Sequence, residues 1–273
     1  MYNYSILQWW FLFLFYCMVG WVVESSYVSI RTKKLTNRGF MRGPWLPIYG
    51  TGFVGWLLIS GSIGLNPIVV YVVGTLSGTA LEFVTGEIME AIFNVRYWDY
   101  SYRKYNIKGQ ICLPNSLYWG LFAMLMTYGI HKPVEKMMLM IPDKPMRFIV
   151  VIGYILMCTD FALSVKAAID MRDILTQLDK AKEELKIIKK RYDVVVAVAS
   201  DGVKDEVDDL KLKYAVLKER IRGLTQIRDI NLRDMIKGNP GMVSRKFGDA
   251  LDTIKSAVYN IRNKDNTEEN DDI

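Results

Sequence analysis

Long apolar runs with few charges fill the first 163 residues, and they constrain the fold of this chain more than any other feature. About 20 apolar residues are enough to cross a bilayer as a helix. Runs that approach this length lie at about residues 7–28, 46–65, 67–88, 113–130 and 147–163. The first run lacks a basic start and a small-residue cleavage site, so we expect a retained span and not a signal peptide. The sequence therefore predicts an all-α transmembrane domain with about five spans.

Charged residues are divided unevenly along the chain. Residues 1–163 contain 13 Lys and Arg against 8 Asp and Glu, whereas residues 164–273 contain 22 against 21. One uniform globular domain would not separate charge in this way. We therefore expect a transmembrane domain at 1–163, a coiled-coil helical hairpin at 164–238, and at 239–273 an amphipathic helix with an acidic tail that is disordered from residue 266.

The second half carries the spacing of a coiled coil. Apolar residues alternate at intervals of three and four over residues 171–199 and again over 203–224, as the a and d positions of heptads do. Ser200-Asp201-Gly202 interrupts the pattern between two stretches of similar length. This break favours an antiparallel hairpin over the alternative, a continuous coiled coil between chains. After the helix-ending sequence at 238–241, residues 247–261 show one apolar helix face.

Basic residues predict the orientation of the chain in the membrane. Because basic loops stay on the cytoplasmic side, we expect the N-terminus outside, the first and third loops inside, and the C-terminal tail in the cytoplasm. The fourth loop breaks this rule with Lys132, Lys136, Lys144 and Arg147. The residues that carry the prediction are Arg31, Lys33, Lys34, Arg38 and Arg42 in the first loop, and Arg96, Arg103, Lys104 and Lys108 in the third.

Glycines and acids recur together where lipid-facing side chains are expected. In the third run they follow one another every four residues, on one slowly drifting helix face, as Gly74, Gly78, Glu82, Gly86 and Glu90. The first run repeats the spacing in residues 20–24. Glycines let a neighbouring helix approach closely, and an acid between them must face protein or water.

These acids predict a polar cavity that forms the path of a substrate or ion. Its candidate residues are Glu24, Glu82, Glu87, Glu90 and Asp99, with Arg38, Arg42 and Arg96 as counter-charges. The alternative is a set of structural ion pairs near helix ends, a reading that suits Glu90 and Asp99 best. We expect Asp160 to be an end-of-helix acid and His131 to be a solvated loop residue.

Composition excludes several chemistries. With one histidine, the chain cannot build a multi-histidine zinc site or a Ser-His-Asp triad away from that residue. Cys17, Cys112 and Cys158 have no Cys-x-x-Cys spacing and are expected to be buried apolar residues. No P-loop sequence is present. We predict no catalytic residue, metal or cofactor, and we attribute the pI of about 9.0 to cytoplasmic loops rather than to nucleic acid binding.

The first half carries an ordered set of motifs. They are Gly20-Trp21 through Glu24, residues 37–52, the Glu-rich third run, Trp98–Ser101, NIKGQICL at 106–113, Ser116, and Trp119-Gly120. Together these motifs resemble the bacterial membrane-protein family of type IV ABC-transporter permeases. The resemblance covers about residues 5–165 and departs from the family at Met41 and Gln110, where leucine and a basic residue are common. It implies a transport component that works with a separate ATPase subunit, with the first and third loops as coupling elements.

Three functions remain open from the sequence. The first is a membrane transport component. The second is a membrane-embedded enzyme that acts on a lipid headgroup, for which Glu87 and Glu90 could supply paired carboxylates. The third is a scaffold that recruits partners through its coiled-coil tail. The partners expected are membrane lipid, a separate ATPase subunit, and further copies of the chain.

Overall fold

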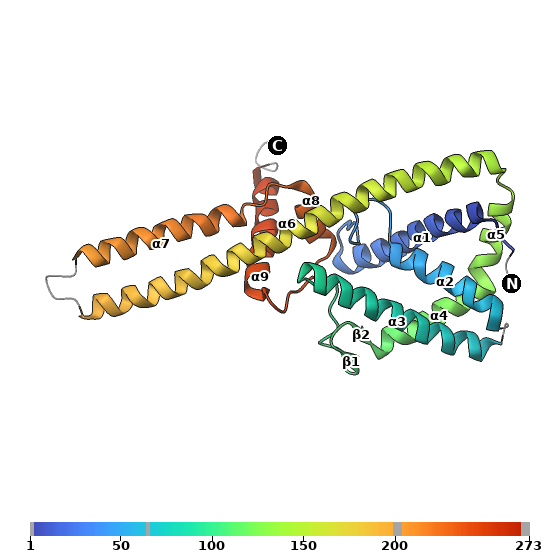
Figure 1. Ribbon diagram of the computed structural model, residues 1–273, viewed down its shortest axis with the longest axis horizontal. Helices are drawn as coiled ribbons and strands as arrows, with labels where there is room; N and C mark the ends of the chain where they lie inside the picture. The colour runs from blue at the N-terminus through green and yellow to red at the C-terminus, as the bar shows by residue number, and fades with distance from the viewer. Residues whose placement is uncertain (1–2, 64–65, 199–203, 269–273) are drawn as a thin grey trace. The chain divides into compact units, whose positions relative to one another are not determined.

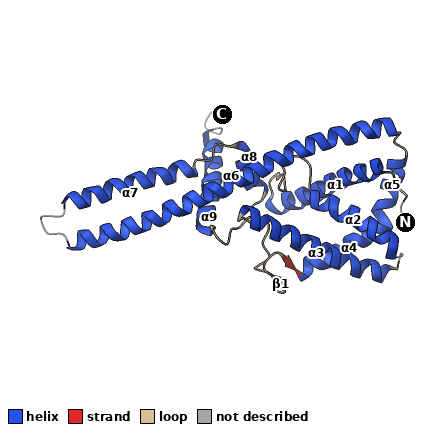
Figure 2. Ribbon diagram, viewed as in Figure 1, coloured by secondary structure: helices blue, strands red, loops and turns tan. Residues whose placement is uncertain are grey.

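The computed structural model describes residues 3–63, 66–198 and 204–268, and these residues are almost entirely helical (Figure 1, Figure 2). The all-α prediction is therefore confirmed, with one addition. Two short strands, β1 (Asn106–Ile107) and β2 (Ile111–Cys112), form an antiparallel hairpin in the third loop. The turn between them forms because both of its central residues have positive φ angles.

The chain divides into two compact units. The first contains residues 1–166 and 237–243, and the second contains residues 167–236 and 244–273. The segment 237–243 thus packs as part of the first unit, although the residues on both sides of it belong to the second.

Three helices of the described residues are long and apolar enough to cross a membrane, namely α1 (Ile6–Thr32), α3 (Pro67–Phe93) and α6 (Asp143–Val198). At 1.5 Å per residue, α1 is about 40 Å long, more than the hydrocarbon core of about 30 Å. Local sequence sets the starts of two of these helices. Ser5 forms a capping box with Gln8 at the start of α1, and Asn66 accepts two amides of the first turn of α3.

The other two expected spans are interrupted or short. α2 (Pro47–Ile63) begins at a proline, and its apolar part is shorter than a full span. α4 (Leu113–Leu125), the π-helix η1 (Met126–Ile130) and α5 (His131–Leu139) follow one another without a gap. Within η1, Thr127 donates its hydroxyl to Ala123 O (2.7 Å) and accepts the Trp56 indole N–H (2.9 Å). The count of five spans stays a prediction.

The helices of the first unit share one apolar core. Leu12 and Tyr16 of α1 and Val70 of α3 are completely buried in it. Other faces of the membrane helices carry large apolar side chains that stay exposed, such as Leu76 on α3 and Phe148 on α6. Apolar faces of this extent are typical of helices that contact lipid.

His131 belongs to this core, and the expectation of a solvated loop residue is wrong. Its side chain is 1% exposed and lies between two tyrosines. The Tyr16 hydroxyl is 2.8 Å from Nδ1, and the Tyr4 hydroxyl is 3.0 Å from Nε2. Because α5 continues directly from η1, the ring points back to α1 and the N-terminal segment instead of to water.

The second unit contains the remainder of α6 with α7 (Lys204–Thr225), α8 (Ile230–Gly238) and α9 (Gly248–Glu268). Some of the predicted a and d positions are buried, namely Met171, Leu178 and Ala181 on α6 and Leu210 and Leu217 on α7. An ion pair of 2.9 Å joins Arg191 of α6 to Glu206 of α7. The expected break at 200–202 lies outside the described residues.

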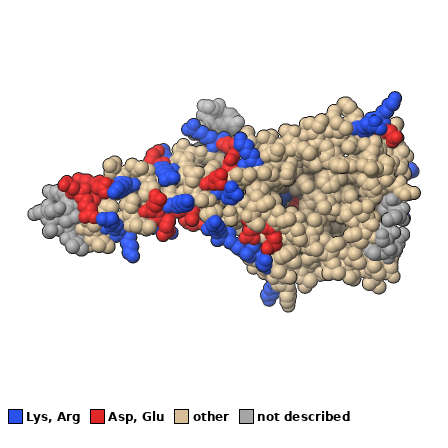
Figure 3. Space-filling view, viewed as in Figure 1, with Lys and Arg blue, Asp and Glu red and all other residues tan. Residues whose placement is uncertain are grey.

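Charge separates the two units as the sequence predicts. Lys, Arg, Asp and Glu gather over α7 and the adjoining part of α6, whereas the visible face of the membrane helices is largely uncharged (Figure 3). The apolar face expected in residues 247–261 is buried at Phe247, Leu251, Ile254 and Val258. α9 reaches Glu268, so residues 266–268 are helical where disorder was expected, and the rest of that stretch lies outside the described residues.

The contact between α3 and α4 generates a prediction about Gly74. A Cβ atom added at Gly74 would overlap Ala123 Cβ of α4, whereas one at Gly55 would meet nothing within 4 Å. Gly74→Ala should therefore destabilise the protein by about 1–3 kcal/mol, because the helices must separate. Thermal unfolding in detergent measures this loss, with Gly55→Ala as the matched control. Equal melting temperatures for the two variants would contradict the packing.

Candidate functional site

The first unit contains three Gly-x-x-x-Glu pairs that bind a side chain of another segment in the same way. In each pair the glycine leaves room for that side chain, and the glutamate four residues later accepts its hydrogen bond. The first pair, Gly20 and Glu24 of α1, holds Tyr49 of α2. A Cβ on Gly20 would lie 2.7 Å from Tyr49 Cδ2, and the Tyr49 hydroxyl donates to Glu24 Oε1 at 2.8 Å.

The second pair, Gly78 and Glu82 of α3, holds Trp119 of α4. A Cβ on Gly78 would lie 2.6 Å from Trp119 Cβ, and the indole N–H donates to Glu82 Oε2 at 3.0 Å. The other carboxylate oxygen accepts the Tyr100 hydroxyl at 3.0 Å, and Asn115 donates to that hydroxyl in turn. Glu82 is 6% exposed, so this acid is buried among neutral donors.

The third pair, Gly86 and Glu90 of α3, holds Gln110 beside β2. A Cβ on Gly86 would overlap the Gln110 amide oxygen, and the amide nitrogen donates to Glu90 Oε2 at 2.8 Å. The same carboxylate oxygen pairs with Arg96 Nε at 2.6 Å. Arg96 is 2% exposed and also reaches Asp99 at 3.5 Å. Glu90, Arg96 and Asp99 therefore form one ion-pair group. Such a group corresponds to the alternative in which Glu90 and Asp99 make structural ion pairs near a helix end.

Glu87 and Arg42 lie away from these groups. Glu87 pairs with Lys108 at 2.9 Å, and both side chains are partly exposed. Arg42 is exposed, and its backbone N–H points to Asp160 Oδ1 at 3.3 Å. Asp160 also accepts the Gly43 N–H at 2.8 Å. Asp160 is thus more than an end-of-helix acid, because it anchors the backbone of the first loop to α6.

The first loop, the third loop and segment 237–243 meet around Arg38. Arg38 donates to Asn239 Oδ1 at 2.7 Å, and the Asn239 amide donates back to Gly39 O at 2.8 Å. Arg96 and Val243 exchange two backbone hydrogen bonds of 2.8 and 3.0 Å. Asn239 is 1% exposed, so its amide satisfies both partners out of contact with water.

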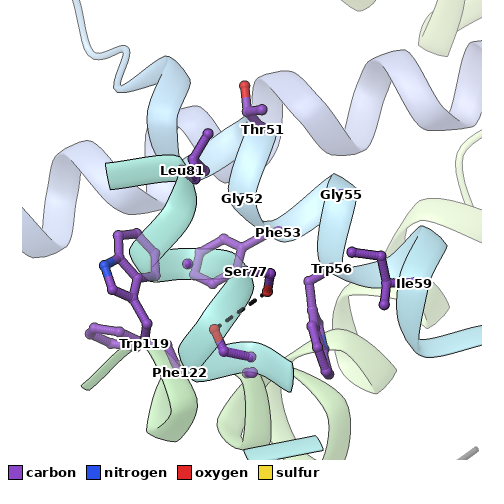
Figure 4. A pocket seen from close by; sticks show the side chains of 13 residues that line it. Thr51, Gly52, Phe53, Gly55, Trp56, Ile59, Ser77, Leu81, Trp119 and Phe122 are labelled. Atoms are coloured by element: carbon purple, nitrogen blue, oxygen red, sulfur yellow. Dashed lines mark hydrogen bonds between the residues drawn. The ribbon is translucent and has the colours of Figure 1, made fainter. Parts of the chain in front are cut away.

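An apolar cavity lies beside the Glu82 site. Its volume is about 170 Å³, and it lies between α2, α3 and α4, with Gly52, Gly55, Gly74 and Gly78 in its walls (Figure 4). No acid or arginine is among the described residues that line this cavity, so it is not the predicted path, and the polar cavity stays a prediction. Trp119 lines the cavity and turns its indole N–H to Glu82.

Sequence reasoning found the acids and missed their donors. Tyr49, Trp119 and Gln110 lie 25, 37 and 20 residues from the glutamates they bind. Their presence in the family-like motifs is the signal that could have pointed to them. The described residues contain no group of three or more His, Cys, Asp or Glu side chains placed to hold a metal ion.

Tyr100 gives a direct test of the Glu82 site. Burial, followed by the nearby Glu82 carboxylate, raises the pKa of the Tyr100 phenol, so the phenol stays a neutral donor. Tyr100→Phe removes this donor and should cost about 1–3 kcal/mol of stability. In a Glu82→Leu background the same change should cost much less, because no carboxylate remains to be satisfied.

Thermal unfolding of the two single variants and the double variant measures this coupling. Tyr105→Phe is the control, since that side chain is 79% exposed. An equal loss from Tyr100→Phe in both backgrounds would show that the hydroxyl does not act through Glu82.

Comparison with known proteins agrees with the motifs and with the membrane helices. A family model described as "Putative ABC-transporter type IV" matches residues 11–165, more than half of the chain. No curated protein and no solved structure matched in the same comparisons. The matched range contains all three Gly-x-x-x-Glu pairs. The chain belongs to this type IV ABC-transporter family and is an ABC-transporter-related membrane protein.

Proposed function

We propose that this protein is the membrane-embedded component of a transporter, and that Glu82 lies on the path of a cationic substrate or ion. The observation that carries the proposal is the set of partners of Glu82. Its two oxygens accept hydrogen bonds from Tyr100 and Trp119, both neutral, and no ion pair to it is found within the described residues.

A buried carboxylate without a positive partner is costly in a membrane protein. Neutral donors reduce this cost, but they leave the negative charge uncompensated. A cation that approaches Glu82 would be attracted by a carboxylate that has no positively charged partner in the described part of the fold. Glu24 supports the same reading, because it accepts a hydrogen bond from the neutral Tyr49 hydroxyl.

The remaining candidate residues have other roles in this proposal. Arg96 pairs with both Glu90 and Asp99, and these ion pairs hold the third loop against α3. Glu87 and Glu90 bind different partners, Lys108 and Arg96. With different partners, these two acids do not act as the paired carboxylates that a lipid-headgroup enzyme would need. These contacts do not favour that enzyme or a partner-recruiting scaffold over a transport component.

We place the first and third loops and the tail in the cytoplasm, with the N-terminus outside, following the basic residues of those loops. The proposed coupling elements to a separate ATPase subunit are the first and third loops, which the contacts of Arg38 with Asn239 and of Arg96 with Val243 join to segment 237–243. Two loops and a segment of the tail meet there, so force on one would reach the others.

The proposed antiparallel hairpin of α6 and α7 rests on their buried a and d positions and on the Arg191–Glu206 ion pair.

Transport by proteoliposomes that contain the protein together with the ATPase subunit it retains, supplied with ATP, tests the role of Glu82. The probes are rubidium, methylammonium and tetraphenylphosphonium, which span small and lipophilic cations. Wild type should take up at least one of them, and Glu82→Gln should lower that rate about tenfold or more through loss of the charge. Glu87→Gln should leave the rate within about twofold, since its charge is partly exposed and paired. Uptake at the wild-type rate by Glu82→Gln, or no uptake of any probe, would refute the cation path.

Purification in mild detergent with mass spectrometry tests the partner. We expect a stoichiometric ATPase subunit that is retained by wild type and by Lys136→Ala. Arg38→Ala combined with Asn239→Ala should reduce its retention, because the first loop loses its side-chain link to segment 237–243. A clean preparation of this chain with lipid alone would argue against the ATPase partner.

A further inference from the structure

The apolar cavity between α2, α3 and α4 has no part in the proposed transport path, and its chemistry points to a different ligand. Its wall consists of aromatic and aliphatic side chains together with glycines, including Phe53, Trp56, Trp119 and Phe122 (Figure 4). We propose that this cavity holds the end of an acyl chain from a bilayer lipid.

The polar groups of the wall argue for a hydrocarbon. The hydroxyls that line the cavity come from Thr51 and Ser77. The Ser77 hydroxyl is already donated to Gly74 O at 3.4 Å, the dashed line in Figure 4. A polar ligand would lose hydrogen bonds to water on entry and find few in return. A hydrocarbon chain makes no hydrogen bonds to water and therefore loses none on entry.

The size of the cavity fits part of such a chain. Its volume of about 170 Å³ is close to that of apolar cavities of about 150 Å³, which stay dry and bind small hydrocarbons such as benzene. The space is therefore large enough for several carbon atoms and unsuited to water. It is too small for a whole lipid, so only the end of a chain would enter.

The cavity also reaches a surface where lipid is available. Ile59 lines it and is 39% exposed, and Thr51 lines it and is also exposed. On α3, next to the lining residue Ser77, Leu76 is 66% exposed. In a membrane protein these apolar surfaces contact acyl chains, which supply the occupant from the side.

Gly55 keeps the space open. A Cβ on Gly52, Gly74 or Gly78 would touch a neighbouring side chain, so these glycines serve packing. A Cβ on Gly55 would meet nothing within 4 Å, so packing does not require glycine there. The Cβ of a larger residue at position 55 would meet no neighbour, and its side chain would take up space in the cavity, which provides the test.

The experiment uses the full chain reconstituted with phosphatidylcholine that carries a diazirine at the end of one acyl chain. After irradiation, mass spectrometry compares labelling of Ile59, which lines the cavity, with labelling of Leu58, an exposed neighbour outside it. In Gly55→Leu the Ile59-to-Leu58 ratio should fall about tenfold, because the new side chain displaces at least two methylene groups of the lipid. Label on Trp56 and Phe122 should fall with it.

Gly129→Leu is the matched control, since it adds the same atoms at an exposed position where the nearest neighbour, Leu125, is at an ordinary 3.5 Å. The Ile59-to-Leu58 labelling ratio of this control should equal that of wild type.

An unchanged ratio in Gly55→Leu, or a wild-type protein with no label on Trp56 and Phe122, would overturn the proposal. If Gly55→Leu does not fold, Gly55→Ala should lower the ratio in the same direction, and an unchanged ratio there would overturn the proposal as well. Because no readout uses transport, these results are independent of Glu82 and of the ATPase.

Discussion

A carboxylate inside an apolar helix bundle must receive hydrogen bonds from the protein itself, and the arrangement of the first unit follows from that requirement. Each glutamate needs a donor from another segment, and a donor can reach it only if the helix leaves room beside it. A glycine one turn earlier provides this room, because positions four apart lie on the same helix face. The three Gly-x-x-x-Glu pairs thereby fix α2 against α1, α4 against α3, and the third loop against α3.

The three pairs are alike in geometry and different in charge. Glu90 receives Arg96 in addition to an amide, so its charge is neutralised within the fold. Glu82 receives an indole and a phenol, which satisfy its oxygens and leave its charge. The same motif therefore yields an ion pair at the end of α3 and, deeper in the helix, a buried carboxyl group whose hydrogen-bond partners are neutral. This difference separates the acid that pairs with Arg96 from the acid on which the proposed cation path depends.

The sequence predicts helices and faces better than it predicts partners. The spacing of glycines and acids in α3 is periodic, so the buried stripe could be found without a structure, and Gly74, Gly78, Glu82 and Gly86 are indeed buried. The donors lie on other segments and follow no period, so the hydrogen bonds that the acids accept could not be predicted. His131 was misplaced for a similar reason, because its burial depends on tyrosines more than 100 residues away. Asn239 shows the same limit, since its sequence context indicates a helix end and not a contact with the first loop.

Trp119 connects the two features that the first unit places between α3 and α4. One part of its indole lines the apolar cavity, and its N–H donates to Glu82. Gly78 holds the ring so closely that it has little freedom to turn without losing one of these contacts. Occupation of the cavity would press on the same ring that satisfies the carboxylate. The proposed lipid and the Glu82 carboxyl group would therefore share one neighbouring side chain, Trp119.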